Sequence, residues 1–183
     1  EGDIISAEVM QVNSNDGRIM LQTRNLKYGK LLNGFMLKTD SNYIRRMKNH
    51  IINFLQDHEE VSIGSIIGTN GYVWVYSPTA NQLDKKADVK VPQLKSVSKR
   101  ERECMSVVRN AIVCLEREQL PIFKETIELV LAEYFKLEES NQLTPLKMLN
   151  REDGIGAILC GQARSLIEKE ISSNMKQFDI QRL

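Results

Sequence analysis

The side chains with the clearest chemical potential are three cations and an aromatic ring in the segment 22–31. Arg24, Lys27 and Lys30 stand around Tyr28. Cations bind phosphate groups without regard to base sequence, and an aromatic ring offers a stacking face to any base. The segment is therefore a candidate contact for single-stranded nucleic acid. The alternative is a solvated charged surface with Tyr28 packed in the core, and the spacing alone does not separate the two.

A second basic cluster follows at Arg45, Arg46 and Lys48. Residues 17–50 contain eight basic side chains and a single acidic one, whereas residues 116–139 contain seven acidic and three basic ones. The formal net charge of +1 hides this asymmetry. We expect the basic part to suit a phosphate backbone, which the acidic part would repel.

A glycine-rich run at residues 64–71 suggests two hypotheses, a nucleotide phosphate loop and a loop that clamps a nucleic-acid backbone. The neighbouring residues argue against both. A phosphate loop needs Lys and Ser or Thr after its last glycine and must open a helix, but an aromatic strand pattern, Tyr72 to Tyr76, follows here. The Gly-x-x-Gly loop of KH domains clamps a nucleic-acid backbone between helices. Here both flanks read as strands and neither variable position is basic. Gly68, Asn70 and Gly71 are therefore predicted to form a structural turn.

The sequence shows no pattern of residues at the spacing of a catalytic triad or a metal site. The two histidines, His50 and His58, lack partners at metal-ligand or triad spacing. The three cysteines form no C-x-x-C pair and fall in helical patterns, so we expect buried free thiols in a reducing compartment; they are Cys104, Cys114 and Cys160. We predict a protein that is not an enzyme and that holds no metal or cofactor.

Strand patterns dominate the first part of the chain. Residues 4–24 alternate around Asp16-Gly17, which predicts a β-hairpin that needs partner strands. Runs at 61–67 and 72–76 flank Asn70-Gly71 and predict a second hairpin. Residues 77–97 are polar and aperiodic, which predicts an inserted loop.

The remaining chain is predicted to be helical. Ser98 and Glu101 form a capping-box pattern, Pro121 marks the start of a second helix, Thr144-Pro145 starts a short helix, and a last helix begins near Gly156. The sequence contains no apolar run of the roughly 18 residues that a membrane span needs. It opens without Met, which indicates a fragment whose upstream region is missing.

Two motifs resemble a known family. Residues 1–9, Asp16-Gly17 and the run 21–31 are similar to the closing OB-fold strands of the exosome cap-subunit family of ribosomal RNA processing protein four. That family carries His where Gln22 stands and often Ser at Asn25. The Gly-x-Asn-Gly turn at 68–71 and the Trp-containing strand after it also match. The similarity covers about residues 1–136, and the family's N-terminal domain and first OB strands are absent.

The resemblance implies an α+β fold with a residual OB-fold β-hairpin, residues 1–33, packed on a KH-type domain, residues 34–183, that has three strands and a helical C-terminal half. It implies a non-catalytic RNA-binding cap subunit of the RNA exosome, which stabilises a ring of RNase PH-like subunits and guides RNA into the pore for 3′–5′ degradation and rRNA processing. Its partners would be RNA, the ring subunits and the other cap subunits, with no membrane. It implies a location in the nucleus and nucleolus, and also in the cytoplasm.

The RNA-facing residues expected on this basis combine both basic clusters: Arg24, Lys27, Tyr28, Lys30, Arg45, Arg46 and Lys48. Three rivals stay open: a sister cap subunit of the same complex, a free-standing OB/KH RNA-binding protein of translation, and an enzyme that uses the glycine run. The sister subunit shares the Gly-x-Asn-Gly turn but lacks the Leu-Lys-Tyr-Gly-Lys-Leu run at residues 26–31.

Overall fold

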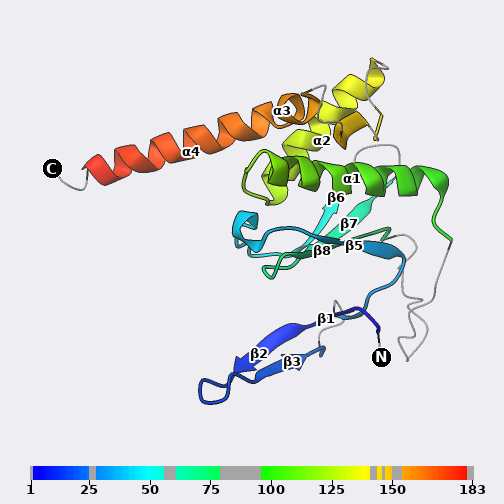
Figure 1. Cartoon of the computed structure of the whole chain (residues 1–183), viewed down its shortest axis with the longest axis vertical. Helices are drawn as coiled ribbons and strands as arrows, with labels where there is room; N and C mark the ends of the chain where they lie inside the picture. Colours follow the sequence, from blue (N-terminus) through cyan, green and yellow to red (C-terminus); the bar gives the residue numbers. More distant parts are fainter. Residues whose placement is uncertain are drawn as a thin grey trace.

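The computed structural model describes residues 2–24, 28–55, 61–78, 96–140, 144–145, 147–149 and 154–180, with side chains described as far as Ser173. Strands occupy the first part of the chain and helices the second (Figure 1). The predicted α+β class is confirmed. Most of the predicted 77–97 loop, residues 79–95, lies outside the described residues.

The centre of the molecule is an antiparallel sheet of four strands in the order β5-β8-β7-β6. These strands are β5 (Gly34–Lys38), β6 (Ile51–Phe54), β7 (Ile63–Ile67) and β8 (Tyr72–Tyr76). Three strands were predicted for this part of the chain, and β6 is the additional one. Ile52 and Phe54 of β6 are buried while Asn53 between them is exposed, so the strand has the alternation of a sheet with one covered face.

The turn between β7 and β8 is the structural feature predicted from Asn70-Gly71. The Gly71 N–H donates to the Gly68 carbonyl at 3.1 Å, and Gly68 and Tyr72 close the hairpin through a 2.9 Å bond. Gly71 has a φ of +89°. Asn70 does not have a positive φ, as a two-residue type I′ turn would require. The hairpin therefore has a three-residue loop, Thr69 to Gly71, that ends in a residue with positive φ.

α1 (Lys99–Arg117) covers one face of the sheet, where it lies against β7 and β8, and α2 (Lys124–Glu139) packs on the far side of α1 (Figure 1). The capping box predicted for α1 is present, since the Ser98 Oγ accepts from the Glu101 N–H at 3.1 Å and the Glu101 carboxylate accepts from the Ser98 N–H at 2.7 Å. The same carboxylate accepts from the buried Ser77 hydroxyl at 2.7 Å, which joins the end of β8 to the start of α1.

The second helix starts later than the prediction at Pro121. Ile122 forms a bridge with Ile44: its N–H donates to the Tyr43 carbonyl at 2.6 Å, and its own carbonyl accepts from the Arg45 N–H at 3.1 Å. Tyr43 ends the short helix η1 (Ser41–Tyr43). Because Ile122 is held in this extended pairing, α2 begins only at Lys124.

The C-terminal part adds the short helix η2 (Lys147–Leu149), α3 (Ile155–Leu159) and α4 (Gly161–Ile180). The predicted last helix is therefore interrupted at Cys160, which separates α3 from α4. Leu159, Cys160 and Ala163 are fully buried and anchor this corner to α1 and α2. From there α4 runs past the helical layer, and its far end projects from the body (Figure 1).

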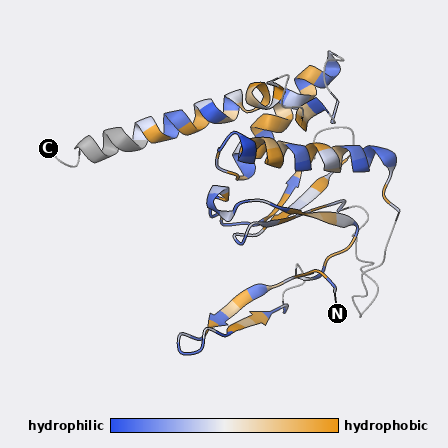
Figure 2. Ribbon diagram, viewed as in Figure 1, coloured by the Kyte–Doolittle hydropathy of each residue, from blue (hydrophilic) through white to orange (hydrophobic). Residues whose placement is uncertain are grey.

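The N-terminal strands lie on the other side of the sheet from α1: β1 (Ile5–Ser6), β2 (Glu8–Val12), β3 (Ile19–Gln22) and β4 (Gly29–Lys30). β2 pairs with β3 through the predicted turn, in which Gly17 has a φ of +70°, and β1 pairs with β4. Within the described residues, this hairpin leaves much of its own apolar surface exposed. Apolar side chains on both faces of the hairpin are more than half exposed: Val9, Met10, Val12, Ile19, Met20 and Leu21 (Figure 2). Two strands have too little surface to cover one another.

No helix in the described part of the chain is both long enough and apolar enough to span a membrane.

Candidate nucleic-acid interface

The first predicted cluster lies beside the pairing of β1 with β4. Arg24 is exposed just after β3, Tyr28 is half-buried, and Lys30 of β4 forms an ion pair with Asp3 at 2.9 Å. Lys27 lies outside the described residues. Both partners of the Lys30–Asp3 pair are about half exposed, so water screens the attraction and the pair stabilises the fold little. An incoming phosphate would have to displace Asp3 from the ammonium, and this screening keeps that exchange inexpensive.

The second predicted cluster follows η1 and leads toward β6. Arg46 and Lys48 are exposed, and neither makes an ion pair with another described side chain. Arg45 differs, because its guanidinium lies 4.4 Å from the centre of the Phe123 ring and 2.8 Å from the Glu170 carboxylate of α4. The sequence alone made Arg45, Arg46 and Lys48 look equivalent. Among the described residues, however, only Arg46 and Lys48 are exposed without an ion-pair partner.

The two clusters are positioned by different elements. The first belongs to the N-terminal strands, and the second is tied to the start of α2 and to α4 through Ile122 and Glu170. Nothing in the described ranges brings them into contact. Their assignment as RNA contacts remains a prediction.

The turn at residues 68–71 is engaged in hydrogen bonds with the neighbouring backbone of the sheet. The carbonyl of Gly71 accepts from the Thr39 N–H at 2.9 Å, and the Asn70 side chain accepts from the Tyr72 N–H at 3.2 Å. A Cβ on Gly71 would lie 2.5 Å from the Thr39 carbonyl oxygen. These contacts fix the end of β5 against the hairpin, as expected for a structural turn.

Sequence reasoning missed an aromatic row on the sheet face opposite α1. Antiparallel pairing sets Lys38 across from Tyr72, with the ammonium 5.8 Å from the ring centre. Tyr72 is 41% exposed, so its ring could stack on a base. Next in the row, Trp74 is only 8% exposed, and its indole N–H has no hydrogen-bond partner in the described structure. The alternation Tyr72-x-Trp74-x-Tyr76 was the available signal, because alternate strand residues share a face.

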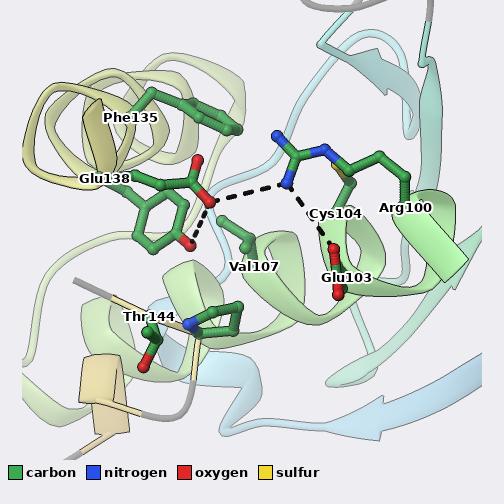
Figure 3. A pocket seen from close by; sticks show the side chains of 9 residues that line it. Arg100, Glu103, Cys104, Val107, Phe135, Glu138 and Thr144 are labelled. Atoms are coloured by element: carbon green, nitrogen blue, oxygen red, sulfur yellow. Dashed lines mark hydrogen bonds and ion pairs between the residues drawn. The ribbon is translucent and has the colours of Figure 1, made fainter. Parts of the chain in front are cut away.

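A pocket of about 360 Å³ lies between α1, α2 and Thr144-Pro145 (Figure 3). Arg100 crosses its mouth and reaches Glu103 at 3.8 Å and Glu138 at 3.6 Å, while the buried Tyr134 hydroxyl donates to Glu138 at 3.2 Å. Burial, reinforced by the neighbouring Glu138, raises the pKa of Tyr134. The phenol therefore stays neutral and serves as a structural donor.

The described residues include no group of three or more His, Cys, Asp or Glu side chains placed to hold a metal ion. The three cysteines are buried and free, as predicted. Cys104 and Cys114 lie on α1, while Cys160 lies between α3 and α4 rather than within a helix.

Comparison with known proteins agrees with the fold. A family model described as a KH domain matches residues 34–81, which include the four-stranded sheet. Exosome complex component RRP4 of Mus musculus is 36% identical over 129 residues, 69% of this chain and 41% of the mouse protein. The same component of Saccharomyces cerevisiae is 40% identical over 88 residues, covering 48% of this chain and 22% of the yeast protein. The homologue of Arabidopsis thaliana is 41% identical over 75 residues, covering 41% of this chain and 22% of the plant protein.

These matches confirm the predicted resemblance. The chain is homologous to exosome complex component RRP4 over about two thirds of its length, and the KH-domain match falls within residues 34–81. The chain spans about two fifths of the length of the mouse relative.

Proposed function

We propose that the chain is part of a non-catalytic, RNA-binding cap subunit of the RNA exosome. In this role it stabilises a ring of RNase PH-like subunits, contacts the other cap subunits and guides RNA into the pore for 3′–5′ processing and degradation, including rRNA processing. The observation that carries the proposal is the homology to RRP4 across 129 residues, which run beyond the KH match into other parts of the chain.

The surface chemistry supports an RNA contact. Arg24, Arg46 and Lys48 are exposed cations, and Tyr28 and Tyr72 offer aromatic rings on the same chain. A cationic surface with scattered aromatic rings binds single strands with little regard to sequence, because the contacts go to phosphates and to base faces. Such binding suits a subunit that passes many RNAs along.

The same observations support a subunit without catalytic activity. In the described pocket between α1 and α2, Arg100 is shared between the carboxylates of Glu103 and Glu138, so these charged groups are engaged with one another. We infer that chemistry on the RNA belongs to another protein. The proposed location is the nucleus and nucleolus, with a further pool in the cytoplasm.

The rival assignments differ in what they bind. A sister cap subunit is less favoured, because the mouse, yeast and plant relatives all carry the name RRP4. A free-standing RNA-binding protein of translation would associate with ribosomes. An enzyme that uses the glycine run is disfavoured, because Gly68 and Gly71 are engaged by the sheet.

Affinity purification of the full-length subunit from extract of its own organism tests the proposal. Recovery of RNase PH-like ring subunits in stoichiometric amounts is expected. Recovery of ribosomal proteins without ring subunits would overturn the exosome assignment in favour of translation. The purified subunit alone should leave a labelled RNA intact, and metal-independent or metal-dependent cleavage by it would contradict the non-catalytic role.

A further inference from the structure

Arg45 is held in a fixed place by three contacts. Its main-chain N–H donates to the Ile122 carbonyl at 3.1 Å, its guanidinium lies over the Phe123 ring at 4.4 Å, and its Nη2 contacts the Glu170 carboxylate at 2.8 Å. The first two contacts come from the segment that enters α2. The third comes from α4, 125 residues away along the chain.

We propose that Glu170 is an internal competitor for the RNA phosphate that Arg45 would bind, so that α4 weakens RNA binding at the cluster Arg45, Arg46 and Lys48. This inference rests on the proposed RNA-binding function. A carboxylate and a phosphate present the same kind of anionic oxygen to a guanidinium, and Arg binds both through the same fork of N–H donors. An occupied Arg45 offers fewer donors to RNA than its exposed neighbours do.

The ion pair between Arg45 and Glu170 is exposed enough for an RNA phosphate to displace the Glu170 carboxylate. The side chains of Arg45 and Glu170 are 44% and 38% exposed, so solvent screens their attraction and an incoming anion can reach it. Two contacts of Arg45 do not involve Glu170: the main-chain bond to Ile122 holds its backbone, and the Phe123 ring holds its guanidinium, so both can persist when Glu170 is displaced. A pre-oriented donor loses less side-chain entropy on binding.

α4 keeps other anchors when this pair opens. Arg164 at its start reaches Glu118 at the end of α1 at 2.8 Å, and Ala163 beside it is fully buried. The Arg45–Glu170 and Arg164–Glu118 pairs have the same length and similar exposure, but of these two only the first involves a residue of the basic cluster. Glu118 therefore provides a matched control for Glu170.

The experiment compares Glu170→Gln with Glu118→Gln in the full chain. Fluorescence anisotropy with a labelled oligouridine gives affinity as a function of salt. Glu170→Gln is expected to tighten binding about three- to fivefold at low salt, the range that a surface ion pair supports, and to steepen the log–log salt slope by up to about 0.7. Glu118→Gln removes the same charge elsewhere and is expected to change affinity less than twofold.

Two further variants keep the result decisive. In an Arg45→Gln background, Glu170→Gln should have no effect, because the cation for which it competes is gone. Glu170→Asp keeps the charge but shortens its reach, so it should give an intermediate gain, and it replaces Glu170→Gln if that variant unfolds. Equal effects of Glu170→Gln and Glu118→Gln would overturn the inference.

Failure of the inference and failure of the proposed function give different results. If Arg46→Gln with Lys48→Gln weakens binding but Glu170→Gln leaves it unchanged, only the competition is disproved. If the unmodified chain shows no affinity for oligouridine, the competition and the RNA contact are both disproved.

Discussion

Asn110, in the middle of α1, donates its side-chain amide to the carbonyl oxygen of Pro145 at 2.7 Å. Two further side chains on the same stripe of the helix do the same: Cys114 contacts the carbonyl of Met148 at 3.4 Å, and Arg117 donates to that of Leu149 at 2.8 Å. The spacing of four and three residues places these donors on one helix face. They satisfy carbonyls of the segment that leads from α2 to α3.

Replacing Asn110 by Ala is expected to destabilise the protein by about 1–3 kcal/mol, because the side chain is buried and the Pro145 carbonyl would lose its donor. The free energy of unfolding in urea measures the loss. Ser106→Ala is the control, since its hydroxyl donates to the Arg102 carbonyl one turn earlier in α1, and the change should alter stability by less than about 0.5 kcal/mol. Equal stability of the two variants would show that this contact does not hold the segment.

In the β7–β8 turn, Gly71 is the position where an added side chain would create the most strain. Gly71→Ala should cost about 1–3 kcal/mol, because the substitution forces a positive φ on alanine and brings its Cβ against the Thr39 carbonyl. Asn70→Ala loses only the bond from the Tyr72 N–H and should cost about 0.5–1.5 kcal/mol. Thermal unfolding ranks the two. A stable Gly71→Ala variant that has lost RNA affinity would indicate a direct role in binding instead.

The features that sequence reasoning predicted correctly are local. The Asp16-Gly17 and Asn70-Gly71 turns, the capping box at Ser98 and the helical C-terminal half all follow from residues close together in the chain. Each depends on φ preferences or on hydrogen bonds between near neighbours, which a single sequence reveals.

The features that it missed depend on distant partners. The pairing of Arg45 with Glu170 spans 125 residues, and no local pattern signals it. The start of α2 was displaced by the bridge between Ile44 and Ile122, which likewise joins separate parts of the chain. The exposed hairpin shows the same limit: alternation identified the strands, but not what would cover Val9 or Leu21.

The buried thiols make a prediction about pH. Burial raises the pKa of Cys114 to about 11 and that of Cys160 to about 12, above the value of about 8.5 for a free thiol. An unfolded chain therefore ionises these thiols first, so the free energy of unfolding should be unaffected below about pH 8 and should fall as the pH rises toward 11–12. Urea unfolding at several alkaline pH values measures this fall.

The same burial predicts slow reaction with Ellman's reagent in the native state. Cys104, Cys114 and Cys160 are each less than 5% exposed, and the thiolate is the reactive form. Denaturant should release three thiols per chain at once. Cys114→Ala and Cys160→Ala variants should each lower that total by one. Rapid labelling of native Cys114 or Cys160 would contradict the packing of α1 against α3.

Removing Lys27 and Lys30 together tests the first basic cluster. For single strands the log of affinity falls against log salt with a slope of about −0.7 per neutralised phosphate, so the double Gln variant should flatten the slope by about one unit and weaken binding to unrelated sequences alike. Lys99 and Lys136 are the control, because they are exposed cations on the helical layer whose ion-pair partners are helix neighbours. Their double Gln variant carries the same net charge as the first but should keep the slope of the parent chain.

Tyr28→Ala should instead cost on the order of 1–3 kcal/mol of binding free energy without changing the slope, while Tyr28→Phe retains the stacking face. Anisotropy titrations of the full-length subunit across a salt series measure both quantities. If the two lysine pairs have equal effects, binding follows net charge alone and the cluster around Tyr28 is not a contact surface for RNA.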